Sequence, residues 1–503
     1  MANAGTHRRQ KRTWSVGATT TIPDRSIRTR GSPNPSVSVP HSGADGADRR
    51  SRKDGFKRPL AEAVFMYDGL KGFRDFYPEE QSARRQVTDA IENAASRYGF
   101  REIATPALER TEMYVDKSGE EIVDELYAFE DKGGREVSLT PELTPTVARM
   151  VVSKGQELSK PIKWMSTRPF WRYEQVQQGR FREFYQTNID IFGSSAPEAD
   201  AEVLAVAADA LTDLGLTADD FEFRVSHRDI LGGLVRSLAA DPETVDTEAA
   251  IRAVDKRAKV DDGEYLGLLS DAGLDRASAR EFDDLITGVD TVADLDAVTE
   301  AGGADVEAAV ENLRNVLAAA NDLGAGEFCD VSLTTARGLD YYTGVVFECF
   351  DATGEVSRSV FGGGRYDDLI ESFGGQPTPA VGVAPGHAPL QLLCQRAGVW
   401  PEESLFTDYY VLSVGETRAK AAEIASGLRD LGHVVESDVA DRSFGAQLGY
   451  ADSINAETVI VVGERDLAND EVTVKDMASG DETTAPVEEF PPESGRPTYE
   501  DYE

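Results

Sequence analysis

The chain has 503 residues, of which 40% are hydrophobic, and a formal net charge of −38 at pH 7. This hydrophobic content suits globular domains and excludes general disorder, and a prior of about 150 residues per domain suggests roughly three units. No run approaches the roughly 18 to 20 apolar residues of a membrane span, and the three cysteines (Cys329, Cys349 and Cys394) lack the spacing of a disulfide framework or a zinc site. We therefore expect a cytoplasmic protein with no metal site and no membrane partner.

The charge is split unevenly along the chain. Residues 1–65 contain 13 Lys and Arg against 5 Asp and Glu, so the remaining 438 residues contain 39 against 85. So acidic a body is typical of a protein from a cytoplasm holding molar salt, where the Debye length falls to about 3 Å. A merely acidic mesophilic enzyme is the alternative. The net charge does not exclude nucleic acid, since a few locally placed arginines can bind a polyanion.

The first 65 residues are rich in Ser, Gly, Pro and Arg and lack apolar periodicity. This composition predicts a disordered basic tail over residues 1–65. A start codon assigned too early is the alternative, because a differently composed sequence opens at Met66.

From Met66 the pattern becomes globular. Residues 78–100 open with Pro-Glu-Glu and have apolar spacing suited to a helix that ends near Gly99. Residues 101–110 read as a strand or extended segment. Residues 125–140 are typical of a hairpin that turns at a pair of glycines, Gly133 and Gly134.

The segment PFWRYEQVQQGRFREFYQTNIDIFG (residues 169–193) concentrates arginine in an acidic chain. In an extended strand alternate side chains share a face, which predicts one face with Arg182, Phe184, Gln186, Asn188 and Asp190. A preceding strand is expected to carry Arg168, Arg172 and Glu174 on one side, with residues 175–179 as the joining loop. Two antiparallel strands would present Arg172, Glu174, Gln186 and Asp190 to a common pocket. A solvent-facing sheet surface is the alternative.

The later segments predict further domains. Residues 195–330 are Ala-, Leu- and Asp-rich with helical runs, and a β-rich piece follows from residue 329. After Pro401 strands alternate with helices, which predicts a small α/β domain. Residues 491–503 read as an acidic frayed end.

Four ordered segments carry a family resemblance: SLTPELT (138–144), WRYEQVQQGRFREFYQTNIDIFG (171–193), ARGLDYYTGVVFE (336–348) and FGGGRYD (361–367). The paired strands with an Arg-bearing loop resemble motif 2 of class II aminoacyl-tRNA synthetases. The whole set, from about Met66 to about residue 480, resembles the histidyl-tRNA synthetase family.

The resemblance implies an α+β fold. It implies a class II catalytic domain over 66–400, with an antiparallel sheet of six or more strands flanked by helices and a helical insertion at about 225–325. It also implies an α/β anticodon-binding domain over 405–490, and a homodimer formed through motif 1, here YGFREIATPALER (98–110).

Site roles are implied residue by residue. Arg172 and Arg337 resemble the catalytic arginines, and Arg172, Glu174 and Arg180 resemble the ATP-binding residues. The histidine-binding set is Thr140, Pro141, Glu142, Thr144, Arg172, Gln186, Asp190, Arg337, Tyr341 and Tyr342. Arginine suits phosphate and carboxylate because its guanidinium is planar and permanently charged. Plainer readings are a helix start for TPEL, a core position for Tyr341 and an ion pair between Arg337 and Asp340.

The glycine-rich segment AVGVAPGHAPL (380–390) departs from the family. It has Pro389 where the family has an arginine that packs on ATP, and Arg396 is too far along the chain to substitute without rearrangement. A lone histidine such as His387 is more often structural than a ligand. Gln175, Gln177 and Gln178 in the motif 2 loop are candidates for hydrogen bonds to the tRNA acceptor stem.

The function implied is ligation of L-histidine to tRNA(His) through a histidyl-adenylate, with ATP and Mg²⁺. The main alternative is the non-catalytic relative that regulates ATP phosphoribosyltransferase in histidine biosynthesis, which lacks the anticodon domain. A class II synthetase for another amino acid, such as threonine or proline, is a third reading. The arginines Arg172 and Arg337 favour the ligase.

Overall fold

The computed structural model describes residues 68–115, 123–155, 157–337, 341–356, 358–401 and 407–490, except for the side chain of Asp305. The expected basic tail over 1–65 and acidic tail over 491–503 lie outside these residues. None of the described helices combines the length and apolarity that crossing a bilayer requires.

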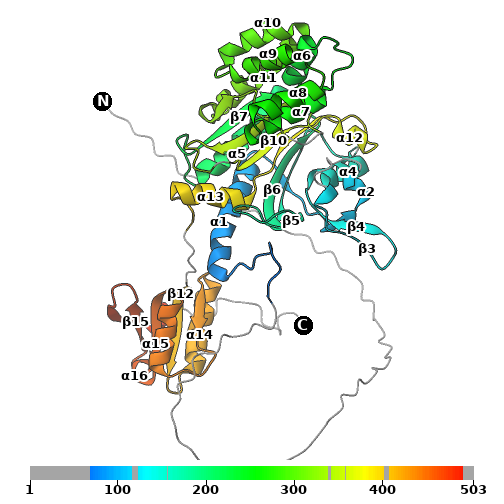
Figure 1. The fold of residues 1–503 in the computed structure, drawn as a ribbon. Coiled ribbons are helices and arrows are strands. Elements are labelled where there is room, and N and C mark those ends of the chain that lie inside the picture. The colour runs from blue at the N-terminus through cyan, green and yellow to red at the C-terminus, as the bar shows by residue number, and fades with distance from the viewer. Residues whose placement is uncertain are drawn as a thin grey trace, which may run out of the picture. The chain divides into compact units, whose positions relative to one another are not determined.

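A mixed sheet of eight strands organises residues 68–401 (Figure 1). In spatial order the strands are β1 (Arg101–Glu102), β5 (Ile162–Trp171), β6 (Glu183–Phe192), β11 (Ala380–Val383), β10 (Phe361–Arg365), β9 (Val345–Asp351), β7 (Phe221–His227) and β8 (Cys329–Val331). The six strands from β5 to β7 in this order pair antiparallel, as expected. The two edge pairs, β1 with β5 and β7 with β8, are parallel.

Strands β5 and β6 form the long antiparallel pair that the alternation predicts. Ile162 lies opposite Phe192, and Trp171 lies opposite Glu183. The expectation that Arg172 and Glu174 lie within the first strand is wrong, because β5 ends at Trp171. One further backbone bond, from Arg172 N to the carbonyl of Arg182 at 3.0 Å, closes the base of the connecting loop.

Two long helices, α1 (Pro78–Arg97) and α5 (Pro197–Asp213), pack on the face of β6 that carries Ile189 and Ile191. Helix α1 begins as its sequence predicts, with Pro78 in the first turn and the Glu80 carboxylate accepting a hydrogen bond from the Tyr77 backbone N–H. Its apolar side chains recur at helical spacing and are buried, which holds the helix against the sheet.

The opposite face of β6, which carries Phe192, is covered by shorter elements. Helices α4 (Thr144–Lys154) and α12 (Leu369–Ser372) share a second apolar cluster with Phe170 and Phe192. A separate three-stranded sheet, in the order β2 (Leu108–Arg110), β4 (Glu136–Leu139), β3 (Ala128–Glu130), contains the expected hairpin, and helix α2 (Glu112–Val115) follows β2. Gly134 has φ +74°, the left-handed conformation that suits glycine at such a turn.

A block of helices lies between β7 and β8, within the region expected to be helical. It comprises α6 (Arg228–Leu238), α7 (Thr247–Lys256), α8 (Asp262–Asp271), α9 (Arg276–Thr287), α10 (Leu295–Gly302) and α11 (Ala304–Asp322). The N-cap residues of α7, α8 and α9 are aspartates whose side chains accept hydrogen bonds from backbone N–H groups of the first turn: Asp246, Asp261 and Asp275 respectively. Part of the acidic composition therefore stabilises helix starts. Helix α13 (His387–Ala397) follows β11 and ends the region.

Residues 407–490 form a separate α/β layer structure. The sheet order is β13 (Val435–Ser437), β12 (Thr407–Val414), β14 (Ala456–Gly463), β15 (Glu471–Asp476), β16 (Glu482–Pro486), with the first three strands parallel. Helices α14 (Arg418–Asp430) and α15 (Phe444–Ser453) contribute to different apolar clusters, and a short helix α16 (Glu464–Leu467) follows β14. This is the expected strand and helix alternation, with β16 added.

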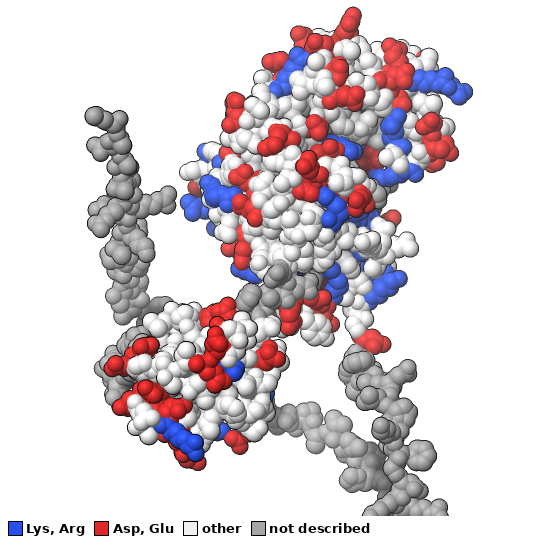
Figure 2. Space-filling view, turned by 90° about the vertical axis from the view of Figure 1, so that its left-hand side faces the viewer, with Lys and Arg blue, Asp and Glu red and all other residues white. Residues whose placement is uncertain are grey.

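On the face of the molecule shown in Figure 2, acidic side chains are spread out rather than gathered in one patch. Figure 2 shows them on the helical block and on residues 407–490 alike, interspersed with fewer basic ones. This distribution matches the excess of Asp and Glu in the sequence.

Candidate active site

A polar cavity opens on the face of the large sheet that carries Gln186, Asn188 and Asp190. It is lined by side chains from segments far apart in the sequence: Glu142, Thr144, Arg172, Gln186, Asn188, Asp190, Arg337, Tyr341, Tyr342, Gly362, Tyr366, Gly382, Val383 and Ala384. Eight of these residues belong to the histidine-binding set expected from the sequence. The alternation of β6 therefore places its polar face in a cavity and not at an open surface.

Backbone without side chains forms one wall of this cavity, on β10 and β11. Gly382 lies opposite Asp190 in the strand register, and a Cβ at position 382 would lie 2.1 Å from Asp190 Oδ1. A Cβ on Gly362 would lie 2.3 Å from Arg337 Nη1. Glycine is required at both positions because a charged side chain occupies the space that a Cβ would fill.

Asp190 lies at the bottom of the cavity. Asp190 is only 3% exposed, and the Tyr366 hydroxyl donates a hydrogen bond to its Oδ1 at 2.5 Å. Burial raises the pKa of Asp190 to about 7, although the Tyr366 hydroxyl bond acts in the opposite direction. The carboxyl is thus able to change its protonation state near neutral pH.

A second carboxylate, Glu142, precedes helix α4. It is 5% exposed, and Oε2 accepts a hydrogen bond from the Tyr341 hydroxyl at 3.3 Å. Tyr341 packs against Tyr342 and Tyr366, with ring centroids 5.0 Å and 5.9 Å away. Burial and the nearby Glu142 carboxylate raise the pKa of Tyr341 well above its ordinary value, so the phenol remains a hydrogen-bond donor.

Two arginines supply positive charge to the same cavity. Arg172 follows β5, and its Nε donates to the Pro141 carbonyl at 3.0 Å. Arg337 follows β8, and its Nη1 lies 3.0 Å from Glu348 Oε1. The carboxylate beside Arg337 is thus Glu348, whereas Asp340, considered from the sequence, lies outside the described residues. Each guanidinium is fixed at one side, which leaves its other donors for a ligand.

Four residues expected at the site do not line the cavity. Thr140 is fully buried and donates to the carbonyls of Pro106 and Ala107, and Pro141 takes part only through the carbonyl that holds Arg172. Glu174 and Arg180 form an ion pair with each other at 3.3 Å in the loop between β5 and β6.

Two further arginines of β5 and the loop, for which no site role was expected, also bind outside the cavity. Arg168 donates to the Pro106 carbonyl at 2.7 Å, and Arg182 stacks 3.8 Å from the centroid of the Tyr173 ring. Neither guanidinium lines the cavity, because Arg168 is held by backbone carbonyls and Arg182 by an aromatic ring, all outside the cavity.

Asn188 and Tyr366 line the cavity but were not assigned a role from the sequence. Asn188 accepts a hydrogen bond from Gln186 Nε2 at 2.8 Å and was already expected on this face by alternation. Tyr366 belongs to the FGGGRYD segment, in which no alternation of polar and apolar residues indicates that the tyrosine faces the cavity. Among the described residues no group of three or more His, Cys, Asp or Glu side chains lies close enough to hold a metal ion.

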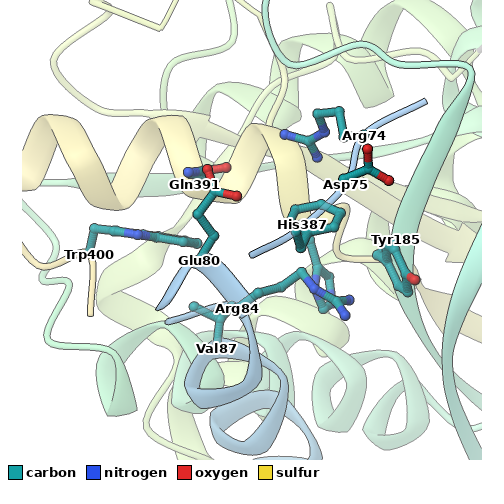
Figure 3. Close-up of a pocket in the computed structure, with 10 residues that line it drawn as sticks. Arg74, Asp75, Glu80, Arg84, Val87, Tyr185, His387, Gln391 and Trp400 are labelled. Carbon is teal, nitrogen blue, oxygen red and sulfur yellow. The ribbon is translucent and has the colours of Figure 1, made fainter. Parts of the chain in front are cut away.

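A second cavity lies on the opposite face of β6, which follows from Tyr185 and Gln186 being neighbours on one strand. Figure 3 shows His387 between Arg74 and Arg84, with Trp400 farther along. His387 Nε2 bonds to Thr187 Oγ1 at 3.1 Å, and burial lowers the pKa of this histidine to about 3. His387 is therefore neutral at physiological pH.

Polar atoms of this second cavity are left without a partner in the described structure. They are Arg74 Nε, His387 Nδ1 and Trp400 Nε1, all buried. Arg74 instead stacks on Phe181, with the guanidinium carbon 3.7 Å from the ring centroid. The structural role expected for His387 is consistent with its bond to Thr187, which fixes the start of α13 to β6.

The sheet, the loop between β5 and β6 and the two arginines in the polar cavity define the arrangement of a class II aminoacyl-tRNA synthetase. A family model described as histidyl-tRNA synthetase matches residues 72–388, and one described as an anticodon-binding domain matches residues 408–493. By these matches and by the relatives described next, the chain belongs to the histidyl-tRNA synthetase family.

Several relatives carry the name histidine–tRNA ligase. The protein of Halorubrum lacusprofundi is 88% identical over 442 residues, which cover 87% of this chain and 100% of the relative. That of Haloquadratum walsbyi is 73% identical with the same coverage, and that of Pyrococcus abyssi is 37% identical over 84% of this chain and 97% of the relative.

Solved structures share the fold. The histidyl-tRNA synthetase of Nostoc has a TM-score of 0.72 at 23% identity and covers 85% of this chain and 99% of that chain. A Bacillus halodurans protein described as an ATP phosphoribosyltransferase regulatory subunit/histidyl-tRNA synthetase has a TM-score of 0.67 at 23% identity, covering 79% and 99%. At this identity the likeness concerns the fold alone.

Proposed function

We propose that this chain joins L-histidine to tRNA(His) in two steps through a histidyl-adenylate, with ATP as the source of AMP. The observation that carries the proposal is the convergence of two carboxylates, Glu142 and Asp190, and two arginines, Arg172 and Arg337, on one cavity. Histidine has an α-ammonium group at one end and a ring N–H at the other, and a carboxylate suits each of these two groups. The carboxylate of histidine and the phosphate beside it need cations between them.

The carboxylates provide selectivity in this proposal. Glu142 binds the α-ammonium group of histidine, and Asp190 accepts the imidazole N–H. Tyr366 holds the Asp190 carboxylate by its 2.5 Å hydrogen bond. Amino acids without a ring N–H would leave the buried Asp190 carboxylate with only the Tyr366 hydroxyl as a donor, which disfavours them.

The arginines provide the chemistry of the first step. One oxygen of the histidine carboxylate attacks the α-phosphorus of ATP, and the bond from that phosphorus to the bridging oxygen breaks as pyrophosphate leaves. Arg172 and Arg337 stabilise the negative charge that spreads over the phosphoryl oxygens. No nucleophile from the protein is required. A ribose hydroxyl at the 3′ end of the tRNA then attacks the activated carbonyl and releases AMP.

Further parts of the proposal concern the form of ATP, the location and oligomeric state of the enzyme, and the domain that binds tRNA. ATP enters as its Mg²⁺ complex, the enzyme works as a cytoplasmic homodimer, and residues 407–490 bind the anticodon arm. The family-model match over 408–493 supports the last assignment. Gln175, Gln177 and Gln178, in the loop between β5 and β6, are candidates for hydrogen bonds to the acceptor stem.

Pyrophosphate exchange tests the proposal directly. The purified protein is incubated in molar KCl with Mg²⁺, ATP, radiolabelled pyrophosphate and each amino acid in turn. Label is expected to enter ATP with histidine and with no other amino acid, because only histidine forms an adenylate. Absence of exchange, together with tight binding to ATP phosphoribosyltransferase, would favour the regulatory role that the ligase-named relatives do not support.

A further inference from the structure

Arg358 is a partly buried arginine next to the loop between β5 and β6, and its guanidinium makes one hydrogen bond among the described residues. Nη2 donates to the Gly179 carbonyl at 2.6 Å. Nε and Nη1 are buried and have no hydrogen-bond partner in the part of the chain that the structure describes. Buried cationic donors left unpaired are costly, so these two nitrogens are suited to an additional acceptor.

Among the described residues, Arg358 has no ion pair of its own with a carboxylate. Burial lowers the pKa of Arg358, and the positive charge of Arg180 lowers it further. The nearby carboxylate is Glu174, which is already bound to Arg180 at 3.3 Å. Two guanidinium groups thus share one carboxylate, which leaves a net positive charge in a strongly acidic chain.

The guanidinium of Arg358 also reaches helix α13. A Cβ placed on Gly179 would lie 3.0 Å from Arg358 Nη2 and 3.0 Å from Leu392 Cδ1, so both side chains flank this glycine. Leu392 follows Pro389 by three residues and therefore lies on the same side of α13. Arg358 thus lies near the helix face that has proline in place of an arginine.

Arg396 does not serve as the replacement. Its Nη1 lies 2.9 Å from Asp220 Oδ1 and its Nη2 lies 3.0 Å from Asp351 Oδ1, at the end of β9. These two ion pairs fix Arg396 away from the loop. Arg358 is consequently the arginine beside Gly179 that retains unused donors.

We propose that Arg358, together with Arg180, binds the β- and γ-phosphates of ATP and so supplies a cation to ATP in a chain that has Pro389 at the family's arginine position. The loop that carries Glu174, Gly179 and Arg180 begins at Arg172, which lines the polar cavity, so a triphosphate bound there would extend along this loop. Nε and Nη1 of Arg358 offer the two adjacent donors that suit phosphate oxygens. The inference rests on the proposed use of ATP.

The test compares ATP with AMP, which lacks the two outer phosphates. Arg358→Gln removes the charge but retains an amide that can donate to the Gly179 carbonyl. Arg358→Lys retains the charge but lacks the paired N–H donors of a guanidinium. Arg314→Ala, in the helical block, is the matched control. Dissociation constants are measured by calorimetry in molar KCl. Arg358→Gln is expected to weaken ATP binding at least tenfold and leave AMP binding within twofold, and Arg358→Lys is expected to lie between.

A second substitution distinguishes a loss of ATP binding from a loss of the folded structure. Adding Pro389→Arg to the Arg358→Gln variant is expected to restore part of the ATP affinity, because it adds a guanidinium one turn before Leu392 on α13. Unchanged ATP affinity in Arg358→Gln, or equal losses for ATP and AMP that Pro389→Arg does not reverse, overturns the inference. If circular dichroism shows that Arg358→Gln does not fold, Arg358→Lys takes its place in the test. Unchanged ATP affinity in Arg358→Lys, or equal losses for ATP and AMP, then overturns the inference.

The two proposals fail in different ways. If the wild-type protein shows no histidine-dependent exchange, the proposed function is wrong, whatever Arg358 binds. If the wild-type protein is active and the Arg358→Gln variant binds ATP as tightly as it does, only the role of Arg358 is wrong.

Discussion

At the scale of single residues, the protonation of Asp190 should control histidine recognition. The carboxylate must be ionised to accept an imidazole N–H, and burial raises its pKa to about 7. The apparent affinity for histidine is therefore expected to fall as the pH drops below about 7, because the free enzyme increasingly holds the protonated acid.

Tyr366→Phe tests this prediction. The substitution removes the O–H donor that lowers the pKa of Asp190, so the acid limb of kcat/KM for histidine should move to higher pH, by about one unit for a hydrogen bond to a charged group. Both enzymes act on the same substrate, so titration of free histidine cancels in the comparison. An acid limb at the same pH in both enzymes would contradict the assignment.

Residue types and their alternation predicted much of the candidate site. Period two placed Gln186, Asn188 and Asp190 on one face of a strand, and the structure has them lining one cavity. Sequence alone could not show that Thr140 faces away, since its carbonyl partners at Pro106 and Ala107 come from a segment about 33 residues earlier. Nor could it show that Arg358 reaches Gly179, because that contact joins residues 179 positions apart.

At the scale of elements, a buried ion pair joins α5 to β10. Arg365 Nη2 lies 2.6 Å from Asp200 Oδ2, and the two side chains are 7% and 0% exposed. Asp200→Asn leaves Asp367, at 3.0 Å, as the remaining carboxylate partner of the buried Arg365 guanidinium, and should lower the free energy of unfolding by about 1 to 3 kcal/mol.

Another pair on the same helix provides the control. Asp213→Asn removes the exposed ion pair with Arg97, whose side chains are 37% and 48% exposed, and should cost less than about 1 kcal/mol. Thermal unfolding of both variants, monitored by circular dichroism in the same buffer, measures the difference. Equal midpoints for the two variants would show that the buried pair contributes no more than the exposed one.

The elements that the sequence predicted are those with strong local signals. Helix α1 has Pro78 and Glu80 at its start and Gly99 just after its end, and the β3–β4 hairpin has adjacent glycines at its turn. The edge strands β1 and β8 lie in segments expected to be extended or β-rich, but with only two and three residues they are too short for periodicity to give their bounds. Their parallel pairing depends on segments that lie more than 60 residues away, which only the folded sheet brings together.

At the scale of the whole molecule, the charge predicts a dependence on salt. Residues 66–503 carry 85 Asp and Glu against 39 Lys and Arg, so the acidic groups repel one another at low ionic strength. The thermal midpoint is expected to rise as KCl increases from 0.1 M to molar concentrations, where the Debye length falls from about 10 Å to about 3 Å. The haloarchaeal relatives are consistent with this expectation.

Sucrose at matched osmolality is the control, because it stabilises folded proteins by exclusion without screening charge. A midpoint that rises equally in sucrose and in KCl, or that does not change with KCl, would show that acidic repulsion does not limit stability.

The glycine wall made by β10 and β11 limits how this enzyme could be re-engineered. Enlarging a binding site usually means trimming side chains, yet Gly362 and Gly382 have none to trim, and any addition there would meet Arg337 or Asp190. A designer who wants the enzyme to accept histidine analogues with bulkier rings must therefore trim the large side chains that line the cavity, such as Tyr341 or Tyr342.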